Sequence, residues 1–228
     1  MKTRLVRVAG LMLALILTAS VLTYGEGFTS IKLPEPRTEG GKPLMEALKE
    51  RQTQREYGPE ELPMQVMSDM LWAVFGINRA ETGKRTAPSA MNMQEIDIYV
   101  ALRQGLYVYD AEDHTLNPVL EADIRADTGP QPFVKDAPVN LVYVADYSKM
   151  TRIPGDMQDF YSGCDTGFIS QNVYLFCASE GLATVVRGYV DKEALAKTMG
   201  LGEDKKVILA QTVGYPKTQV KEPEEKGD

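Results

Sequence analysis

The stretch VNLVYVA, residues 139–145, is a nearly continuous apolar run bounded by Pro138 and Asp146. A strand with one face in water alternates apolar and polar residues, whereas a strand covered on both faces reads as an unbroken apolar run. We therefore expect residues 139–145 to form a buried strand of a sheet that is packed on both sides.

Helical and strand patterns alternate on either side of this run. On the N-terminal side we expect helices over Pro43–Glu56 and Pro63–Phe75, a polar loop over Asn78–Pro88, and strands over Ile96–Leu102, Leu106–Tyr109 and Leu116–Leu120. On the C-terminal side we expect a helix over Asp165–Leu182, a strand over Ala183–Gly188, a helix over Lys192–Met199 and a strand over Lys206–Val213. Interspersed helices and strands indicate the α+β or α/β class, with a mixed sheet packed by helices.

The first 25 residues have the pattern of a secretory signal. Three basic residues precede the apolar run Val8–Leu17, and small residues follow it. We expect export to the periplasm or cell envelope with cleavage after Ser20 or Gly25, and an uncleaved membrane anchor is the alternative.

Two further segments flank the expected domain. Residues 26–42 contain Pro34, Pro36, Gly40 and Gly41 among mixed charges, which is typical of an extended linker or arm. Residues 218–228 form a charged tail. Residues 43–217 are then one domain with one core, which a chain of about 200 residues can bury.

Charge and missing motifs exclude several classes of function. The formal net charge is −7, and loss of the basic N-terminal segment makes it more negative, so nucleic acid and anionic membranes are poor partners. The chain lacks G-x-S-x-G, G-x-G-x-x-G and P-loop motifs and any metal-ligand spacing. If the protein is an enzyme, a cofactor carries the chemistry.

The cysteines and the single histidine are expected to be structural. Cys164 and Cys177 are separated by 13 residues of an expected helix, about 20 Å at 1.5 Å per residue, whereas a disulfide tolerates at most about 7 Å between Cα atoms. We expect two free thiols. His114 lies in the polar stretch DAEDHTL and is expected in a solvated loop.

Three short stretches carry groups suited to an anionic cofactor. RQTQR at residues 51–55 places two guanidinium groups and a hydroxyl at the end of the first expected helix. On its own, this stretch is equally compatible with a solvated basic turn that binds no ligand. RTAPSAMNMQ at residues 85–94 puts hydroxyl and amide groups on a proline-stiffened loop before a strand. GLATVVRG at residues 181–188 turns a helix into a strand, and Gly188 allows close approach to backbone amides.

Taken in this order, the stretches resemble the FMN-dependent nitroreductase superfamily. That superfamily has an R-x-[ST]-x-R stretch, a P-S-x-x-N-x-Q loop, a Q-N helix and a G-L-x-x-x-x-x-G turn; the matching residues are Arg51, Thr53, Arg55, Pro88, Ser89, Asn92, Gln94, Gln171, Asn172, Gly181, Leu182 and Gly188. GINRAETGKRTAPSA, GLYVYDAEDHTL and DAPVNLVYVADYSKM further resemble its SagB-type branch, which includes azoline-oxidising dehydrogenases. The resemblance spans residues 44–217, and it implies an α+β fold.

The resemblance implies a phosphate site in the first stretch. Arg51 and Arg55 would pair with the FMN phosphate, and Thr53 would supply a hydroxyl partner. Many relatives carry a second arginine where this chain has Gln52, so one contact is expected to be lost. After the last strand, Lys217 or Lys221 would reach the phosphate, with a solvated tail lysine as the alternative.

The resemblance also implies that two chains build each site. In relatives the P-S loop comes from the second subunit of a domain-swapped homodimer, which would place Pro88, Ser89, Ala90 and Met91 over the flavin, supported by Asn92. In relatives, the backbone at the positions of Arg187 and Gly188 donates N–H groups to flavin N5 and O4.

The resulting expectation is an exported, homodimeric FMN oxidoreductase that works in alternating half-reactions through flavin N5. A nitroaromatic, quinone or conjugated acceptor would remove the hydride. Because nicotinamide dinucleotides are cytoplasmic, export requires another donor, or a substrate oxidised by an externally reoxidised flavin. The alternative is a flavin-binding or partner-binding module without turnover.

Overall fold

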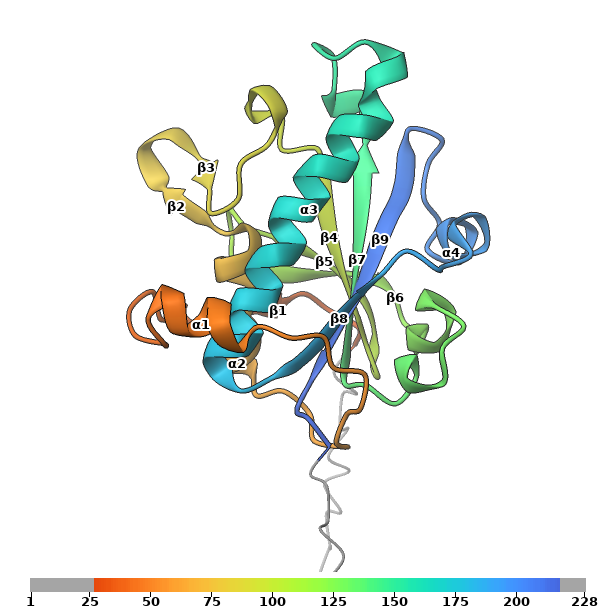
Figure 1. Cartoon of the computed structure of the whole chain (residues 1–228). Helices are drawn as coiled ribbons and strands as arrows, with labels where there is room; N and C mark the ends of the chain where they lie inside the picture. Colours follow the sequence, from red (N-terminus) through yellow and green to blue (C-terminus); the bar gives the residue numbers. More distant parts are fainter. Residues whose placement is uncertain (1–26, 218–228) are drawn as a thin grey trace, which may run out of the picture.

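The structure is a computed structural model that describes residues 27–217 (Figure 1). The expected signal segment 1–25 and Lys221 lie outside the described residues. Within residues 27–217, no helix has the length and apolarity that crossing a membrane requires.

A seven-stranded sheet forms the centre of the molecule (Figure 1). Its strands, in spatial order, are β1 (Ile31–Lys32), β6 (Thr115–Leu120), β5 (Gly105–Asp110), β4 (Ile96–Leu102), β7 (Val139–Asp146), β9 (Lys205–Gly214) and β8 (Ala183–Arg187). Neighbouring strands of this sheet are antiparallel at every described pairing, so the sheet is antiparallel rather than mixed. All eight residues of β7 are buried, as its apolar run predicts.

Among the described residues, α2 (Met64–Phe75) and α3 (Gly155–Glu180) cover one face of the sheet, α4 (Lys192–Thr198) covers the other, and α1 (Leu44–Glu50) packs against α3. One core cluster joins Ile98 of β4 and Leu141 of β7 to side chains of α2 and α3. A second cluster, on the other face, joins Tyr99 and Val142 to Leu195 of α4. Alternate residues of the same central strands therefore serve opposite cores, which confirms an α+β architecture packed on both sides.

Helix α3 is longer than the sequence predicts. It begins at Gly155 rather than Asp165 and ends before Gly181, whose positive φ of 69° caps it. Its first half buries polar residues such as Asp165 and exposes Phe160 and Phe168, so apolar periodicity does not reveal it. Both cysteines lie on this helix, and the prediction of two free thiols is confirmed.

Helix α1 is shorter than the sequence predicts. It ends at Glu50 rather than Glu56, because the following residues run extended beside β8, where the Gln54 amide donates to the Thr184 carbonyl at 3.0 Å. Its apolar residues Leu44 and Met45 do not enter the core, since they are 62% and 76% exposed. The first basic stretch is therefore an extended segment rather than the last turn of a helix.

Two short antiparallel strands form within the region predicted to be a polar loop. β2 (Ile77–Arg79) and β3 (Lys84–Arg85) pair across the 3₁₀ turn η1 (Ala80–Thr82), and Gly83 closes the hairpin at a φ of 60°. The expected arm, residues 26–42, also packs on the domain, because it supplies β1 and buries Leu33.

The expectation that His114 is solvated is wrong. Its ring is half-buried, with Nε2 2.7 Å from Ser68 Oγ and Nδ1 3.0 Å from the Tyr109 hydroxyl. Ser68 in turn donates to the Pro34 carbonyl at 2.6 Å, and burial lowers the pKa of the imidazole. His114 therefore ties the β5–β6 turn to α2 and the arm.

Candidate functional site

The first basic stretch is fixed against the C-terminal half of α3. The Tyr174 hydroxyl lies 3.1 Å from Thr53 Oγ1 and accepts the Val186 N–H at 3.1 Å, so one phenol joins residues 51–55 to β8. The guanidinium carbon of Arg51 lies 5.3 Å from the centroid of the Tyr174 ring. This cation–π contact holds Arg51 beside the C-terminal end of α3.

A hollow of about 440 Å³ opens beside Arg51. It lies between the basic stretch, the end of α3 and the last described residues, and Lys42, Lys49, Gln52, Gln54, Cys177, Gly181, Leu182 and Pro216 are among its lining residues. Lys42 is paired with Glu50 at 2.6 Å, but Arg51 forms no ion pair within the part of the chain that the structure describes. An unpaired guanidinium at a polar hollow suits an anionic group.

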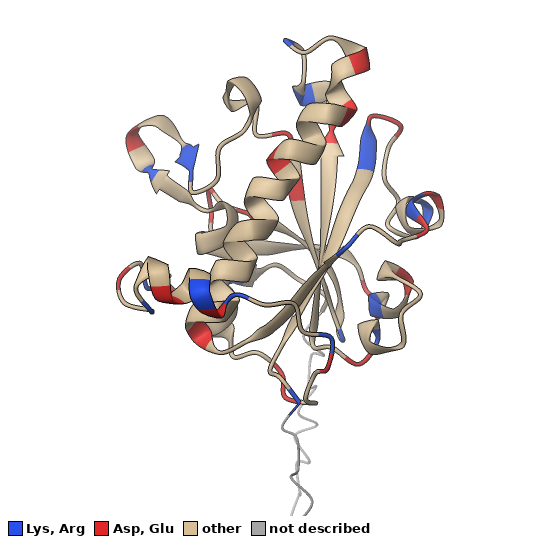
Figure 2. Ribbon diagram, viewed as in Figure 1, with Lys and Arg blue, Asp and Glu red and all other residues tan. Residues whose placement is uncertain are grey.

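A second hollow, of about 290 Å³, adjoins the first through Gln54 and Pro216, and Arg55 and Lys217 line it. The Lys217 amide donates to the Glu56 carbonyl at 3.1 Å, which fixes the end of the described chain beside the basic stretch. The structure thus brings Lys217 to the same edge as Arg51 and Arg55. In the view of Figure 2, basic and acidic residues are interspersed along the ribbon.

Arg187 ends β8, and its side chain points to the face opposite α3. The residue is 5% exposed; Nε donates to Thr212 Oγ1 at 3.0 Å, and the terminal nitrogens donate to Thr128 and Asn140. Burial lowers the pKa of the guanidinium to about 10. Arg187 has no carboxylate partner among residues 27–217 and lines neither of the two hollows, so its side chain is a structural cation.

Replacing Arg187 with methionine is expected to lower the free energy of unfolding by about 2 to 4 kcal/mol, because the Thr128 carbonyl and the Asn140 side chain lose buried donors. Urea unfolding at one fixed protein concentration measures the loss. The control is Arg103→Met, which breaks only a surface ion pair with Glu61 and should cost less than about 1 kcal/mol. Equal losses in the two variants would contradict the structural role of Arg187.

Hydrogen bonds within the loop and to α3 and the segment before it hold the P-S loop in place. Ser89 Oγ accepts the Gln94 N–H at 2.9 Å, the Ala90 N–H donates to Asp165 at 2.7 Å, and Arg152 donates to the Met91 carbonyl at 2.6 Å. Pro88 and Asn92 are exposed, and the Met91 side chain is 58% exposed. The loop is therefore well formed but presents its tip to solvent.

The P-S loop and the basic stretch do not meet within one chain. The loop contacts α3 at Asp165, whereas the basic stretch contacts it at Tyr174, nine residues further along, or about 13 Å at 1.5 Å per residue. Within one chain the two groups therefore contact different parts of α3.

Two of the remaining motif residues act within the fold. The Asn172 amide donates to the carbonyls of Ala73 and Val74 at the end of α2, and Gln94 accepts from Arg85 and donates to the Gly83 carbonyl. Gln171 is exposed on α3. Sequence reasoning missed Tyr174 altogether, because an aromatic residue inside a helix has the same signal as any core residue.

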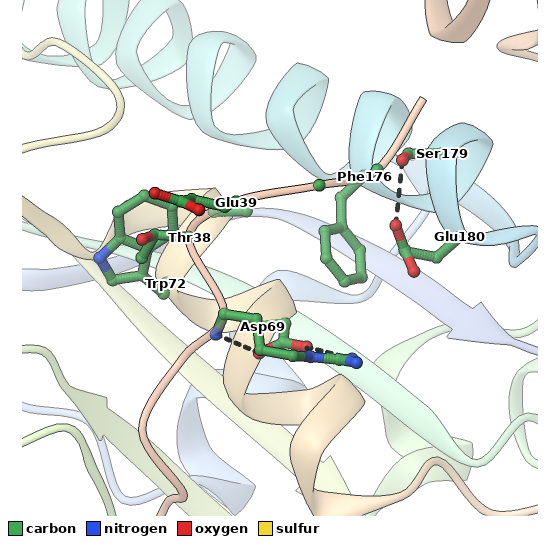
Figure 3. A pocket seen from close by; sticks show the side chains of 11 residues that line it. Thr38, Glu39, Asp69, Trp72, Phe176, Ser179 and Glu180 are labelled. Atoms are coloured by element: carbon green, nitrogen blue, oxygen red, sulfur yellow. Dashed lines mark hydrogen bonds and ion pairs between the residues drawn. The ribbon is translucent and has the colours of Figure 1, made fainter. Parts of the chain in front are cut away.

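A further hollow of about 400 Å³ lies between residues 37–41, α2 and α3 (Figure 3). Phe176 and Glu180 extend from α3, and Trp72 and Asp69 from α2, where Asp69 binds Arg37 Nε at 2.8 Å. None of the predicted cofactor residues lines this hollow.

Residues 48–215 match the family model described as "Nitroreductase family". The chain belongs to the nitroreductase family. A nitroreductase-family protein of Methanocaldococcus jannaschii is 33% identical over 161 residues, which cover 66% of this chain and 81% of that protein. The assignment to an oxidoreductase family follows from these matches.

Solved structures agree with this assignment. The crystal structure of a nitroreductase-family protein from Ralstonia eutropha JMP134 shares 43% identity at a TM-score of 0.81, covering 85% of this chain and 92% of that one. The NADPH:FMN oxidoreductase from Vibrio harveyi, solved with NAD+, shares 20% identity at a TM-score of 0.56, covering 77% and 69%. At that identity the second match indicates the fold alone.

Proposed function

We propose that this protein is an exported, homodimeric FMN-dependent oxidoreductase of the SagB-type branch of the family. The observation that carries the proposal is the grouping of Arg51, Arg55 and Lys217 around two adjoining hollows at the C-terminal end of α3. No carboxylate pairs with Arg51 or Arg55 among the described residues, so both remain available to a phosphate. A fold neighbour named for FMN supports the choice of flavin.

The residues around these hollows have separable roles. Arg51, which makes a cation–π contact with Tyr174, binds phosphate oxygens from the first hollow. Arg55 and Lys217 bind phosphate oxygens from the second hollow. Thr53 adds a hydroxyl, and Gln52 lines the first hollow as a neutral side chain. Of the two lysines, Lys217 is the one we assign to phosphate, because its backbone is fixed to Glu56.

The turn after β8 orients the reacting end of the cofactor. The buried Arg187 side chain holds the strand end in place, and exposed Gly188 leaves its backbone open to a flat ring. Backbone N–H groups aimed at a ring position stabilise charge that develops there without any catalytic side chain. Bound FMN supplies hydride transfer at N5 to or from a small organic donor or acceptor.

A second copy of the chain completes each site in this proposal. Support comes from α3, whose outer face exposes Phe160 and Phe168, and from α1, which exposes Leu44 and Met45. Exposed apolar rows of this kind mark interaction surfaces. The P-S loop, with its tip in solvent, is then free to cover the partner's cofactor with Ser89 and Met91.

Protein purified with added FMN is expected to be yellow and to hold one flavin per chain. Flavin absorbance against protein concentration gives the stoichiometry, and turnover with nitroaromatic and quinone acceptors, against a flavin-free control, tests the activity. Stoichiometric flavin with no reduction of any acceptor would favour a flavin-binding module without turnover. Protein that binds no flavin would contradict the proposal.

Export is proposed on the N-terminal pattern of residues 1–25. It disfavours a nicotinamide donor and favours a donor available outside the cytoplasm, or a substrate oxidised by an externally reoxidised flavin, as in the azoline-oxidising relatives.

A further inference from the structure

Glu95 is a fully buried acid whose carboxylate oxygens accept no hydrogen bond from any described residue. It directly precedes β4 and is 0% exposed, and no N–H or O–H group of the described residues donates a hydrogen bond to either carboxylate oxygen. Its backbone is fixed, because its carbonyl accepts the Asp146 N–H at 2.9 Å. A buried carboxylate without a donor is costly, so this group requires a physical explanation.

Asp165 on α3 is the acidic residue that acts on Glu95, because the nearby carboxyl group of Asp165 raises the pKa of Glu95. Asp165 is 2% exposed, and its Oδ2 accepts the Ala90 N–H of the P-S loop at 2.7 Å. Two carboxyl groups in a buried site are compatible when they share a proton, because one then donates to the other.

The loop that Asp165 holds has an unusual backbone. Met91, Asn92 and Gln94 all have positive φ, at 51°, 55° and 49°. Residues other than glycine adopt this region only when surrounding contacts hold them there. The Ala90–Asp165 hydrogen bond is one of those contacts.

The other charged groups near Glu95 do not neutralise it. From η5 (Tyr147–Lys149), Lys149 is committed to Asp97 at 2.6 Å, and the Tyr147 hydroxyl donates to Asp159. The Asp146 carboxylate accepts from Ser148 and lies near Lys205. Burial, with a further contribution from Asp165, raises the pKa of Glu95 to about 7.

We propose that Glu95 is a positioning residue for the cofactor site: it keeps a proton that it donates to Asp165, and Asp165 thereby holds Ala90 and the P-S loop in place. The role rests on the proposed function, in which this loop covers the flavin. Glu95 touches neither substrate nor flavin and acts through Asp165.

The sign of the pH dependence follows from the raised pKa. Below about pH 7 the carboxyl pair keeps its proton and the loop is held. As the pH rises through 7, Glu95 loses its proton and two negative charges face each other in a buried site, which loosens the loop. The affinity for FMN should therefore fall as the pH rises from 6 to 8.5, by about tenfold.

The test compares full-length protein with Glu95→Gln, whose amide donates to Asp165 at every pH. The FMN dissociation constant of the wild type should rise about tenfold between pH 6 and 8.5, and that of E95Q should stay near the low-pH value. The control is Glu81→Gln, an exposed acid on η1 that should keep the wild-type profile. Because all variants bind the same FMN, titration of its phosphate cancels in the comparison.

A second readout needs no flavin. Hydrogen exchange in residues 86–94, expressed as protection relative to the unfolded peptide, should fall with rising pH in wild type and not in E95Q. Wild-type protection that stays constant from pH 6 to 8.5, or the same fall in both proteins, would overturn the inference. If no protein binds FMN at any pH, the proposed function fails, while the exchange measurement still decides the role of Glu95.

Discussion

Replacing Arg51 and Arg55 together with alanine is expected to weaken FMN binding by about 10²- to 10⁴-fold. Each charge-assisted hydrogen bond to phosphate contributes about 1.5 to 3 kcal/mol, and two are removed. Riboflavin, which has no phosphate, should bind wild type and variant with similar affinity. Quenching of flavin fluorescence measures both ligands.

The matched control for this variant removes two exposed cations from elsewhere on the surface. Arg103→Ala with Lys135→Ala changes the net charge by the same amount, yet neither residue lines the two hollows. A general electrostatic effect would weaken FMN in both double variants. Equal weakening of FMN and riboflavin in the Arg51 and Arg55 variant would mean that these arginines do not hold the phosphate.

The sheet was predictable because its strands obey local rules. β7 reads as an unbroken apolar run, and β4 alternates its side chains between two cores. The hairpin of β4 and β5 turns at Arg103 and Gln104, and Gly105, which begins β5, has a φ of 155° that suits glycine. In each case the residues of one short segment contain the information that fixes its structure.

Helix boundaries depended on tertiary contacts that the sequence does not display. α3 extends ten residues further towards its N-terminus, over residues 155–164, where the buried Ser162 donates to the Gln158 carbonyl and Phe160 is exposed. α1 stops at Glu50 because the next residues hydrogen-bond to β8, more than 120 residues away. Periodicity reports burial of apolar residues and therefore misses both effects.

The candidate site also contains residues that the sequence predicts and residues that only tertiary contacts reveal. The basic stretch is local, and the structure brings Arg51, Arg55 and Lys217 to one edge. Tyr174, which orders this stretch, and Glu95, which has no partner in its own segment, were invisible as functional residues. Their roles depend on which side chain lies opposite them, and a single sequence does not show that.

Changing Phe160 and Phe168 together to glutamate is expected to turn the proposed dimer into monomers that do not retain FMN. The two rings are 60% and 49% exposed on the outer face of α3. In a twofold interface each substitution occurs twice, so four buried rings are lost, at about 1.5 to 3 kcal/mol each. The dimer dissociation constant should rise by at least about 10⁴-fold.

Sedimentation equilibrium of the FMN-loaded proteins measures the assembly, and flavin absorbance in the same cell measures occupancy. The control is Val119→Glu, which places the same charge on an exposed apolar position of β6, away from α3, and should leave a flavin-loaded dimer. A variant that remains dimeric would show that α3 does not form the interface. A monomer with one flavin per chain would overturn the shared site, because a complete site would then form within one chain.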